Sequence, residues 1–434
     1  MKNILLALVE LQVRRFLRKH KPKVIVVAGS VGKTSTKLAI ATVLSTRHKV
    51  LFQEGNYNVD ISVPMTIFDL PMPPLEKLRN PFTWLLQLWY MERKIHLPFP
   101  FEVILLELGT DHPGDINHFR KYLRPDIAIV TAVAPEHMEY FKTIDAVAQE
   151  ELAVANFSEL AIINRDDIDE TFARYVNNSN IDTYGTSGVA EYHYLVNDFE
   201  PGKGFVGKLV SPEFGEQPVV LRLAGEHNVR AAVAAAVVGI KMGLQPKEIV
   251  AGLEKIRPVS GRMNILRGLL DSTIIDDTYN SSPSAAVAAL QTLYLFPTKQ
   301  RIAILGSMNE LGDFSAEAHE QVGAVCDPTL LEWVVTIGDE AERYLAPAAS
   351  KKGCQVRSFQ SPYDAGAFVH SVLAPHAVVL AKGSQNGVFA EEAIKILLHE
   401  SHEESQLVRQ SAEWVAKKEA AYDRFAGLDS GKKK

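Results

Sequence analysis

The chain has 434 residues, of which 47% are hydrophobic and 23% are charged, and its formal net charge is −6 at pH 7. This length allows two or three domains with cores of their own. The acidic balance disfavours a general nucleic-acid-binding protein, because such proteins carry a basic excess. The two cysteines, Cys326 and Cys354, have neither metal nor redox spacing. We therefore expect reduced thiols and a cytoplasmic protein.

Residues 1–22 precede the first predicted strand and are typical of a basic amphipathic helix. The residues that could share its apolar face are Leu5, Leu8, Val9, Val13, Phe16 and Leu17, and the basic residues that follow are Arg14, Arg15, Arg18 and Lys19. Two interpretations stay open, a helix docked on the domain and a helix lying on an anionic membrane surface. No segment reaches the roughly 20 apolar residues that span a bilayer.

From residue 24 onward, apolar strands alternate with helical patterns, which predicts an α/β fold with a mainly parallel sheet and helices on both faces. The expected strands of this first domain are 24–29, 49–54, 102–109, 127–133 and 160–164. Short antiparallel strands are expected between 183 and 223, followed by a helix at 226–243. Residues 72–101 read as an insertion between a helix and a strand.

A second α/β series begins after Pro258. Its expected strands are 272–277, 301–306, 333–338 and 377–383. We therefore predict an ATP-binding domain over 23–258 and a Rossmann-like α/β domain over 259–399. The remaining residues, 400–434, are charged and helical in pattern, and we expect them to be a solvated tail.

The stretch "VIVVAGSVGKTST" places a glycine turn between a strand and a helix, where backbone N–H groups and the helix N-terminus can hold an anion. The residues expected at the nucleotide are Gly29, Ser30, Val31, Gly32, Lys33, Thr34 and Ser35. Lys33 would place a positive charge at the β- and γ-phosphates, and Thr34 would offer its hydroxyl to Mg²⁺. The usual P-loop pattern lacks its first glycine here, because Val27 stands at that position, so this is a shorter variant.

Two further residues follow buried strands at the predicted carboxyl edge of the sheet, where open α/β sheets bind ligands. Glu107, in "LLELGTDHPGD", is a carboxylate that would be costly to bury unless it holds a metal or forms an ion pair. His137, in "TAVAPEHMEYF", is either a metal ligand or a structural histidine. Both alternatives stay open for each residue.

The second domain begins with polar residues that could meet a nucleotide. Arg262, in "SGRMNIL", lies at the domain boundary and could contact a phosphate. The stretch "IIDDTYNSSPSA" places Asp276, Asp277, Tyr279 and Asn280 at the end of the first expected strand of that domain.

Taken together, these stretches resemble the Mur ligase family, and within it the MurF type. The resemblance covers about residues 23–397. It is carried by "GSVGKTST", "GNYNVDISVPMTIF", "LLELGTDHPGDI", "RPDIAIVTAVAPEHMEYF", "GEHNVRAAVAAAVV", "GRMNIL", "IIDDTYNSSPSA", "RIAILGSMNELGDFSAEAHEQVG" and "LAKGSQNGVFAEEAIKIL". Several matches in the same order are far more specific than any one of them.

The resemblance implies ATP-dependent amide bond formation in the synthesis of peptidoglycan precursors. ATP phosphorylates a carboxylate of UDP-N-acetylmuramoyl-tripeptide, and D-alanyl-D-alanine attacks the acyl phosphate. The residues implied to hold Mg²⁺ are Thr34, Glu107 and His137, with Lys33, His137 and Arg262 at the reacting groups. Asn228 would face adenine, and Arg262, Asp277, Tyr279 and Asn280 would reach ATP from the second domain. Asn56 and Asn58 would contact the carboxylate substrate, and Lys382 and Ser384 the amine substrate.

Two departures from the family pattern stand out. Glu151 occupies the position where Mur ligases commonly carry a carbamylated lysine that binds a second metal. Either Glu151 replaces that ligand, directly or through a water, or the second metal is weaker or absent. Only about 22 residues precede the P-loop strand, so the resemblance also implies that the usual UDP-binding domain is missing. UDP would then be recognised elsewhere, or the substrate would not be a UDP-sugar.

The insertion at 72–101 contains Trp84, Leu85, Leu88, Trp89 and Tyr90, which favour either a packed surface helix or a contact with substrate or membrane. Two alternative functions stay open: the same ligase chemistry on a lipid-linked or other non-UDP substrate, and a P-loop ATPase that acts as a switch. We expect small-molecule substrates, no nucleic-acid partner and a monomer. We also expect a cytoplasmic location, and peripheral contact with the inner face of the membrane stays open as an alternative.

Overall fold

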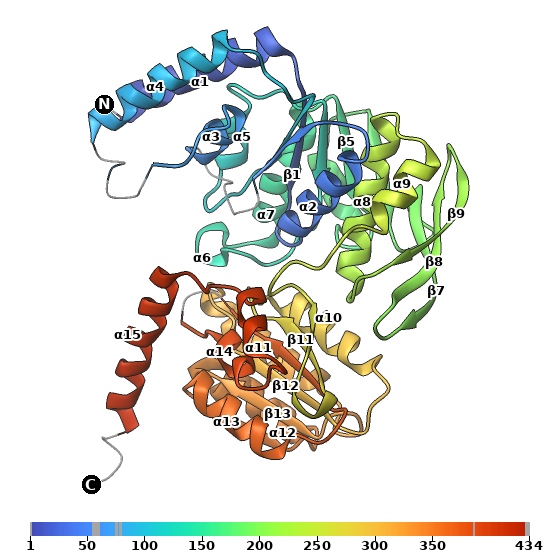
Figure 1. Cartoon of the computed structure of the whole chain (residues 1–434), viewed down its shortest axis with the longest axis vertical. Coiled ribbons are helices and arrows are strands. Elements are labelled where there is room, and N and C mark those ends of the chain that lie inside the picture. The colour runs from blue at the N-terminus through green and yellow to red at the C-terminus, as the bar shows by residue number, and fades with distance from the viewer. Residues whose placement is uncertain (1, 54–60, 74–76, 78–79, 385–386, 430–434) are drawn as a thin grey trace. The chain divides into compact units, whose positions relative to one another are not determined.

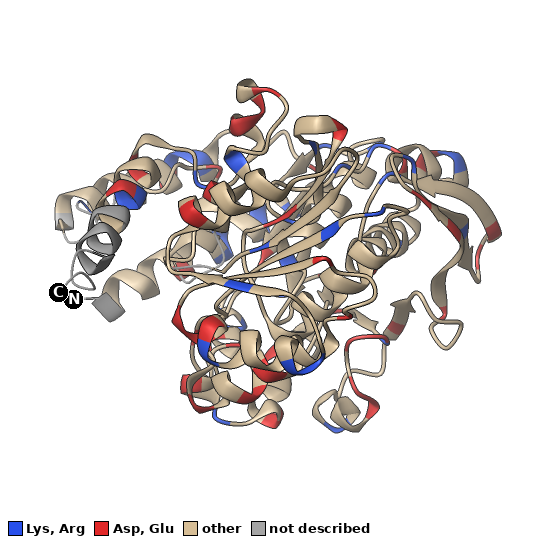
Figure 2. Cartoon of the chain, turned by 90° about the horizontal axis from the view of Figure 1, so that it is seen from below, with Lys and Arg blue, Asp and Glu red and all other residues tan. Residues whose placement is uncertain are grey.

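The structure, a computed structural model, describes residues 2–53, 61–73, 77, 80–384 and 387–429 (Figure 1). It divides into two compact units. Unit 1 comprises Met1–Arg222 and His227–Arg257, and unit 2 comprises Leu223–Glu226 and Pro258–Lys434. Lys and Arg are interspersed with Asp and Glu over both units (Figure 2). No helix among the described residues is long and apolar enough to cross a membrane.

Unit 1 is built on a nine-stranded sheet in the order β2-β3-β1-β4-β5-β6-β7-β8-β9. The strands are β1 (Lys23–Ala28), β2 (Val50–Leu51), β3 (Val103–Glu107), β4 (Ile127–Val130), β5 (Leu160–Asn164), β6 (Ile181–Gly185), β7 (Tyr192–Glu200), β8 (Gly204–Ser211) and β9 (Gly215–Leu221). Pairing is parallel from β2 through β7, and β7, β8 and β9 form an antiparallel meander. Every residue of β3 and β4 is buried, as expected for parallel strands covered on both faces.

Helices cover this sheet. Those of unit 1 are α1 (Lys2–His20), α2 (Lys33–Leu44), α3 (Ser62–Ile67), α4 (Pro81–His96), α5 (Asp115–Phe119), α6 (Met138–Phe141), α7 (Ile144–Glu151), α8 (Glu226–Lys241) and α9 (Pro246–Leu253). The insertion predicted at 72–101 contains α4. Its start is set by Asn80, whose side chain accepts a hydrogen bond from the Phe82 N–H, and by a proline at the first helical position. Helix α4 packs beside α1 (Figure 1).

Unit 2 contains a six-stranded sheet in the order β10-β11-β15-β12-β13-β14. The strands are β10 (Asn264–Arg267), β11 (Thr273–Asp277), β12 (Arg301–Gly306), β13 (Trp333–Ile337), β14 (Val356–Phe359) and β15 (Val378–Lys382). The helices are α10 (Pro283–Tyr294), α11 (Ser315–Val325), α12 (Ala346–Lys351), α13 (Pro362–Val372), α14 (Ala390–Lys395) and α15 (Ala412–Asp429). Among the described strands of this sheet, β10 is antiparallel to its neighbour and the others pair in parallel.

The predicted α/β class with mainly parallel sheets is confirmed in both units. Some local predictions were wrong. The strand expected at 49–54 is reduced to Val50–Leu51 among the described residues, and β10 and β14 were not predicted. The region expected to be antiparallel from 183 begins with β6, which is parallel to β5.

The residues after 400 are not simply a solvated tail. Leu407 and Val408 are buried, and so is the Lys418 side chain on α15. The expectation was wrong because a charged helix can bury a single lysine when buried carboxylates of a neighbouring helix neutralise its charge.

Both cysteines are free thiols and are buried, and burial raises the pKa of each.

Candidate active site

The P-loop connects β1 to α2 and requires glycine at two positions. Gly29 has φ +124° and Gly32 has φ +87°, both in the region that side chains rarely adopt. A Cβ on Gly29 would lie 2.3 Å from the hydroxyl of Thr131, which follows β4. The tight turn from β1 into α2 therefore requires glycine at these two positions. The turn places the N-terminus of α2, a helix of twelve residues, at the carboxyl edge of the sheet.

Side chains from neighbouring segments hold the shape of the loop. The Thr131 hydroxyl donates to the Val31 carbonyl at 2.6 Å, and the Ser30 hydroxyl accepts from the Ala134 N–H at 3.1 Å. Lys33 Nζ donates to the Gly29 carbonyl at 2.6 Å and lies 3.7 Å from a Glu136 carboxylate oxygen. The lysine is thus folded over the loop, where its charge is available to a bound anion.

Glu107, the last residue of β3, is brought to the P-loop by the register of the sheet, in which it pairs with Val27 of β1. Its carboxylate is 4% exposed and accepts from the Thr34 hydroxyl at 3.2 Å. A buried lysine one helical turn further on, Lys37, places Nζ 3.0 Å from the same carboxylate. Lys37 was not predicted from the sequence. Its spacing of three residues from Thr34, on the same face of α2, was the available signal.

Glu151 is the last residue of α7 and contacts the P-loop. Its carboxylate accepts a hydrogen bond from the Gly29 N–H at 2.7 Å and is 2% exposed. Burial raises its pKa to about 7, the positive charge of Lys33 opposes that rise, and the negative charge of Glu136 adds to it. The carboxylate of the neighbouring Glu150 instead accepts hydrogen bonds from the backbone N–H groups of Gly114 and Ile116. These bonds hold the loop before α5 in place.

His137 directly precedes α6 and adopts φ +50°, an unusual conformation for a residue with a side chain. Its Nε2 lies 3.6 Å from an Asp111 carboxylate oxygen and 3.8 Å from a Glu136 carboxylate oxygen. The structure thus groups His137 with two carboxylates from the loops that follow β3 and β4.

The predicted metal ligands fall into three sets: Thr34 with Glu107, Glu151 with Gly29, and His137 with Asp111 and Glu136. Over the described part of the chain, no three His, Cys, Asp or Glu residues form a ready-made metal cluster. The first set nevertheless fits Mg²⁺, because this ion binds one or two protein oxygens and takes its other ligands from phosphates and water. Glu151 fits less directly, since its carboxylate already accepts from the P-loop backbone.

The other predicted residues of unit 1 are placed as follows. Ser35 lies half-buried on the first turn of α2, and Asn228 is buried on the first turn of α8. Asn56 and Asn58 lie outside the described residues. The structure therefore groups the P-loop residues with Glu107 and Glu151, and it places Asn228 on a separate helix of the same unit.

In unit 2, Asp277 and Lys382 end the neighbouring strands β11 and β15 and form a buried ion pair, 2.9 Å between Nζ and Oδ2. Asp277 also accepts from the Met263 N–H at 3.2 Å, and Lys382 donates to the Asn280 carbonyl. The Ser384 hydroxyl accepts from the Asn309 N–H at 3.2 Å. Lys382, predicted for the amine substrate, is thus joined to Asp277 and Asn280, which were predicted for ATP.

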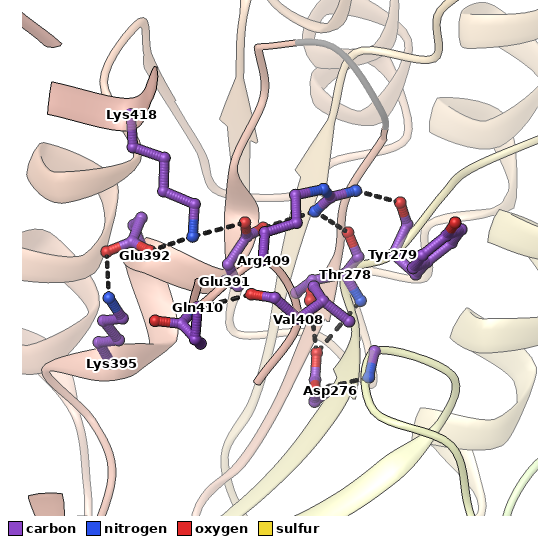
Figure 3. A network of polar contacts seen from close by, with 11 residues as sticks. Asp276, Thr278, Tyr279, Glu391, Glu392, Lys395, Val408, Arg409, Gln410 and Lys418 are labelled. Carbon is purple, nitrogen blue, oxygen red and sulfur yellow. Dashed lines mark hydrogen bonds and ion pairs between the residues drawn. The ribbon is translucent and has the colours of Figure 1, made fainter. Parts of the chain in front are cut away.

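The ring of Tyr279 lies close to two arginines. Arg262 places its guanidinium carbon 4.4 Å from the ring centroid and Arg409 lies at 5.5 Å. Arg409 also donates to the Tyr279 carbonyl and forms an ion pair with the fully buried Glu391 at 2.9 Å (Figure 3). Arg409 was not predicted as a site residue, because it lies in the stretch expected to be a solvated tail.

Comparison with known proteins identifies the family of the chain. The Mur ligase middle domain matches residues 98–239, and the Mur ligase glutamate ligase domain matches residues 261–385. The UDP-N-acetylmuramoyl-tripeptide--D-alanyl-D-alanine ligase of Haemophilus influenzae is 30% identical over 339 residues, which cover 76% of this chain and 67% of that protein. The chain belongs to the Mur ligase family.

Solved structures of Mur ligases share the fold. MurF from Acinetobacter baumannii superposes with a TM-score of 0.73 at 25% identity, covering 90% of this chain and 79% of that one. MurF from Thermotoga maritima, solved in complex with ADP, superposes with a TM-score of 0.72 at 22% identity, covering 92% and 84%. The predicted family and fold are therefore confirmed, and the chain is a ligase of the Mur type.

Proposed function

We propose that this Mur ligase uses ATP to activate a carboxylate of UDP-N-acetylmuramoyl-tripeptide and joins D-alanyl-D-alanine to it through an amide bond. The observation that carries the proposal is the P-loop with Lys33, Thr34 and Glu107 at one sheet edge, in a chain whose similar proteins bear this activity in their names. The reaction passes through an acyl phosphate, which the amine attacks with loss of phosphate.

In unit 1, the P-loop N–H groups and the start of α2 would bind the triphosphate. Lys33 would exchange its loop carbonyls for phosphate oxygens and neutralise charge on the transferred phosphoryl group. Mg²⁺, when bound by Thr34 and Glu107, would add positive charge at the phosphates. Lys37 would hold the Glu107 carboxylate in place. His137, and Glu151 through a water, are the proposed ligands of a second ion.

In unit 2, Arg262, Asp277, Tyr279 and Asn280 are proposed to contact the nucleotide, while Asn228 of unit 1 faces adenine. Lys382 and Ser384 are proposed for the amine substrate, and Asn56 and Asn58 for the carboxylate substrate. The contacts of Lys382 with the Asp277 carboxylate and the Asn280 backbone carbonyl support a coupled arrangement, because a change at Lys382 alters the surroundings of both residues. The use of ATP and a nucleotide sugar favours action in the cytoplasm, and a monomer is the proposed oligomeric state.

The direct experiment measures phosphate release from ATP with Mg²⁺, with each of the two substrates added singly and together. Peptide products are followed by mass. Phosphate release that needs both substrates, with the mass gain of an amide-linked dipeptide, is expected. Release without either substrate, or release without that product, would instead assign the ligase to another substrate or make it an ATPase.

A second experiment addresses Glu151. If this carboxylate helps to hold a metal, both Glu151→Ala and Glu151→Gln should lose most ligase activity, because neither side chain offers an anionic oxygen. If it only accepts the Gly29 N–H, Glu151→Gln should retain activity, since an amide oxygen can accept the same hydrogen bond. Activity lost in the alanine variant and kept in the glutamine variant would count against the metal role.

A further inference from the structure

Helices α1 and α4 form a parallel pair at one side of unit 1 (Figure 1). Gln12 Nε2 donates to the Glu92 carboxylate at 2.9 Å, Arg15 forms an ion pair with the same carboxylate, and a ring nitrogen of His20 lies 3.2 Å from the Ile95 carbonyl oxygen. Later residues of α1 therefore meet later residues of α4. The N-terminal ends of both helices lie at the same end of the pair.

The inward faces of the pair are packed into the core of unit 1. Val13, Phe16 and Met91 are almost fully buried, and Trp84 is 7% exposed. The predicted alternative of a docked N-terminal helix therefore accounts for one face of α1. It leaves the outward faces of both helices to be explained.

The outward face of α1 changes character along its length. Ile4, Leu8 and Leu11 are 68%, 44% and 47% exposed and recur at helical spacing. Continuing that spacing on the same face gives Arg15, whose charge is paired with Glu92 of α4, and Arg18, and both are exposed. The first half of the face is apolar and the second half is basic.

The outward face of α4 changes in the same way. Phe82, Leu85 and Trp89 are 76%, 62% and 54% exposed and follow the same helical spacing. Arg93 comes next on that face, with its guanidinium 5.8 Å from the Trp89 ring centroid. Because the helices are parallel, the apolar halves lie together at one end of the pair and the basic halves at the other.

The charge balance of the pair is opposite to that of the chain. Helix α1 carries five Lys or Arg and one Glu, and α4 carries two Lys or Arg and one Glu, whereas the whole chain has a net charge of −6. An apolar end with exposed aromatic rings, followed by a basic band, matches the order of layers in a bilayer that contains anionic lipids.

We propose that the α1–α4 pair docks the enzyme on an anionic lipid bilayer, with the apolar ends in the interface and the basic ends at the lipid phosphates. A second copy of the chain is a poorer occupant. Two pairs placed face to face would set either basic ends against basic ends or basic ends against apolar ends, and both arrangements are unfavourable.

Vesicle sedimentation tests the proposal, with the full-length protein and vesicles of phosphatidylcholine alone or mixed with phosphatidylglycerol. The protein should bind the mixed vesicles, bind the neutral ones at least tenfold more weakly, and lose binding as salt is raised. The double variant L85S/W89S should lose at least tenfold in binding, and R18E/K19E should lose the preference for anionic vesicles. The matched control is Leu195→Ser, an equally drastic change at an exposed leucine on β7, which should bind as the unchanged protein does.

Several results would overturn the proposal. These are equal binding to both vesicle types, unchanged binding in L85S/W89S, and no binding to either vesicle. A dimer that L85S/W89S dissociates, in a protein that ignores vesicles, would assign the surface to a second copy instead. Circular dichroism and thermal melting establish that each variant is folded. The assay needs no ligase substrate, so its outcome is independent of the proposed reaction.

Discussion

At the scale of single residues, the Glu107–Lys37 pair is the least expected part of the site. Both side chains are almost fully buried, and Thr34 is the neighbour through which they meet the P-loop. A buried carboxylate whose cation is removed is left without compensation. Lys37 is therefore inferred to compensate the charge of the Glu107 carboxylate and to hold it beside Thr34.

We expect Lys37→Met to lower the free energy of unfolding by about 3–5 kcal/mol and to weaken nucleotide binding in the presence of Mg²⁺. Urea unfolding and ADP titration measure the two effects. Lys208→Met, which removes one partner of the exposed ion pair with Glu216, should change stability by less than about 1 kcal/mol. The double variant K37M/E107Q should recover part of the loss, and additive losses would contradict a direct coupling.

Asp276 gives a pH-dependent prediction. It is fully buried and accepts from the Gly261 N–H and from the N–H and hydroxyl of Thr278 (Figure 3). Burial raises its pKa to about 6, and the three donors only partly oppose that rise. The native state therefore retains a proton that the unfolded chain releases near pH 4. Stability from this group is present below about pH 4 and is lost as pH rises toward 6.

The expected result is that the stability of the unchanged protein falls relative to Asp276→Asn between pH 4 and pH 6. Above pH 6 the difference between the two should be constant. Urea unfolding at half-unit pH steps measures it. A difference that grew in favour of the unchanged protein with rising pH would mean that the pKa of Asp276 is lowered.

At the scale of elements, the sequence predicted long buried strands well and short or exposed ones poorly. Strands such as β3 and β4 are continuous apolar runs, which few other structures can bury. β2 has two residues, and the four residues of β14 are half-buried or exposed, so neither carries a periodic signal. The direction of β6 could not be predicted, because it depends on pairing with β5 and not on its own residues.

The segment after residue 400 shows the same limit. Arg409 and Lys418 are charged, and charge alone predicts exposure. In the structure both pair with Glu391, which lies on α14 and is fully buried (Figure 3). These pairs form because the fold places the Glu391 carboxylate of α14 beside the residues after 400. The sequence alone therefore did not predict that this segment packs against α14.

Arg409→Ala should therefore destabilise unit 2 by about 2–4 kcal/mol, less than complete loss of a buried pair because Lys418 remains beside Glu391. It should also free the backbone of Tyr279, which loses a donor to its carbonyl. Urea unfolding measures the first effect. Arg267→Ala, which breaks an exposed pair with Asp271, serves as the control and should cost less than about 1 kcal/mol. Equal losses in both variants would refute a special role for the buried pair.

At the scale of the whole molecule, the sequence predicted the residues at the carboxyl edges of the strands but not how they are held. Glu107 and Asp277 were found because each ends a buried strand. Lys37 and Arg409, which neutralise buried carboxylates from other elements, give no motif. The positions of Glu107 and Asp277 follow from the ends of their strands, which the sequence predicts. The contacts of Lys37 and Arg409 depend on how separate elements pack, which the sequence does not predict.

The two units have separate sheets, and this leads to a prediction about nucleotide binding. A ligand stabilises only those openings of the chain that destroy its site. With ADP and Mg²⁺ at a hundredfold excess over Kd, exchange of amide hydrogens in β1 and α2 should slow by up to about 100-fold, equivalent to about 2.7 kcal/mol.

Amides in β13 and β14 of unit 2 should change by less than about threefold if unit 2 opens without disturbing the P-loop. Lys33→Ala, which removes the cation folded over the loop, should abolish the protection in unit 1. Equal slowing in both sheets would instead show that the nucleotide also stabilises unit 2, either through the contacts proposed for unit 2 or because both units open together. In the second case nucleotide bound at the P-loop would stabilise Asp277 and Lys382 as strongly as Glu107, because any opening would release it.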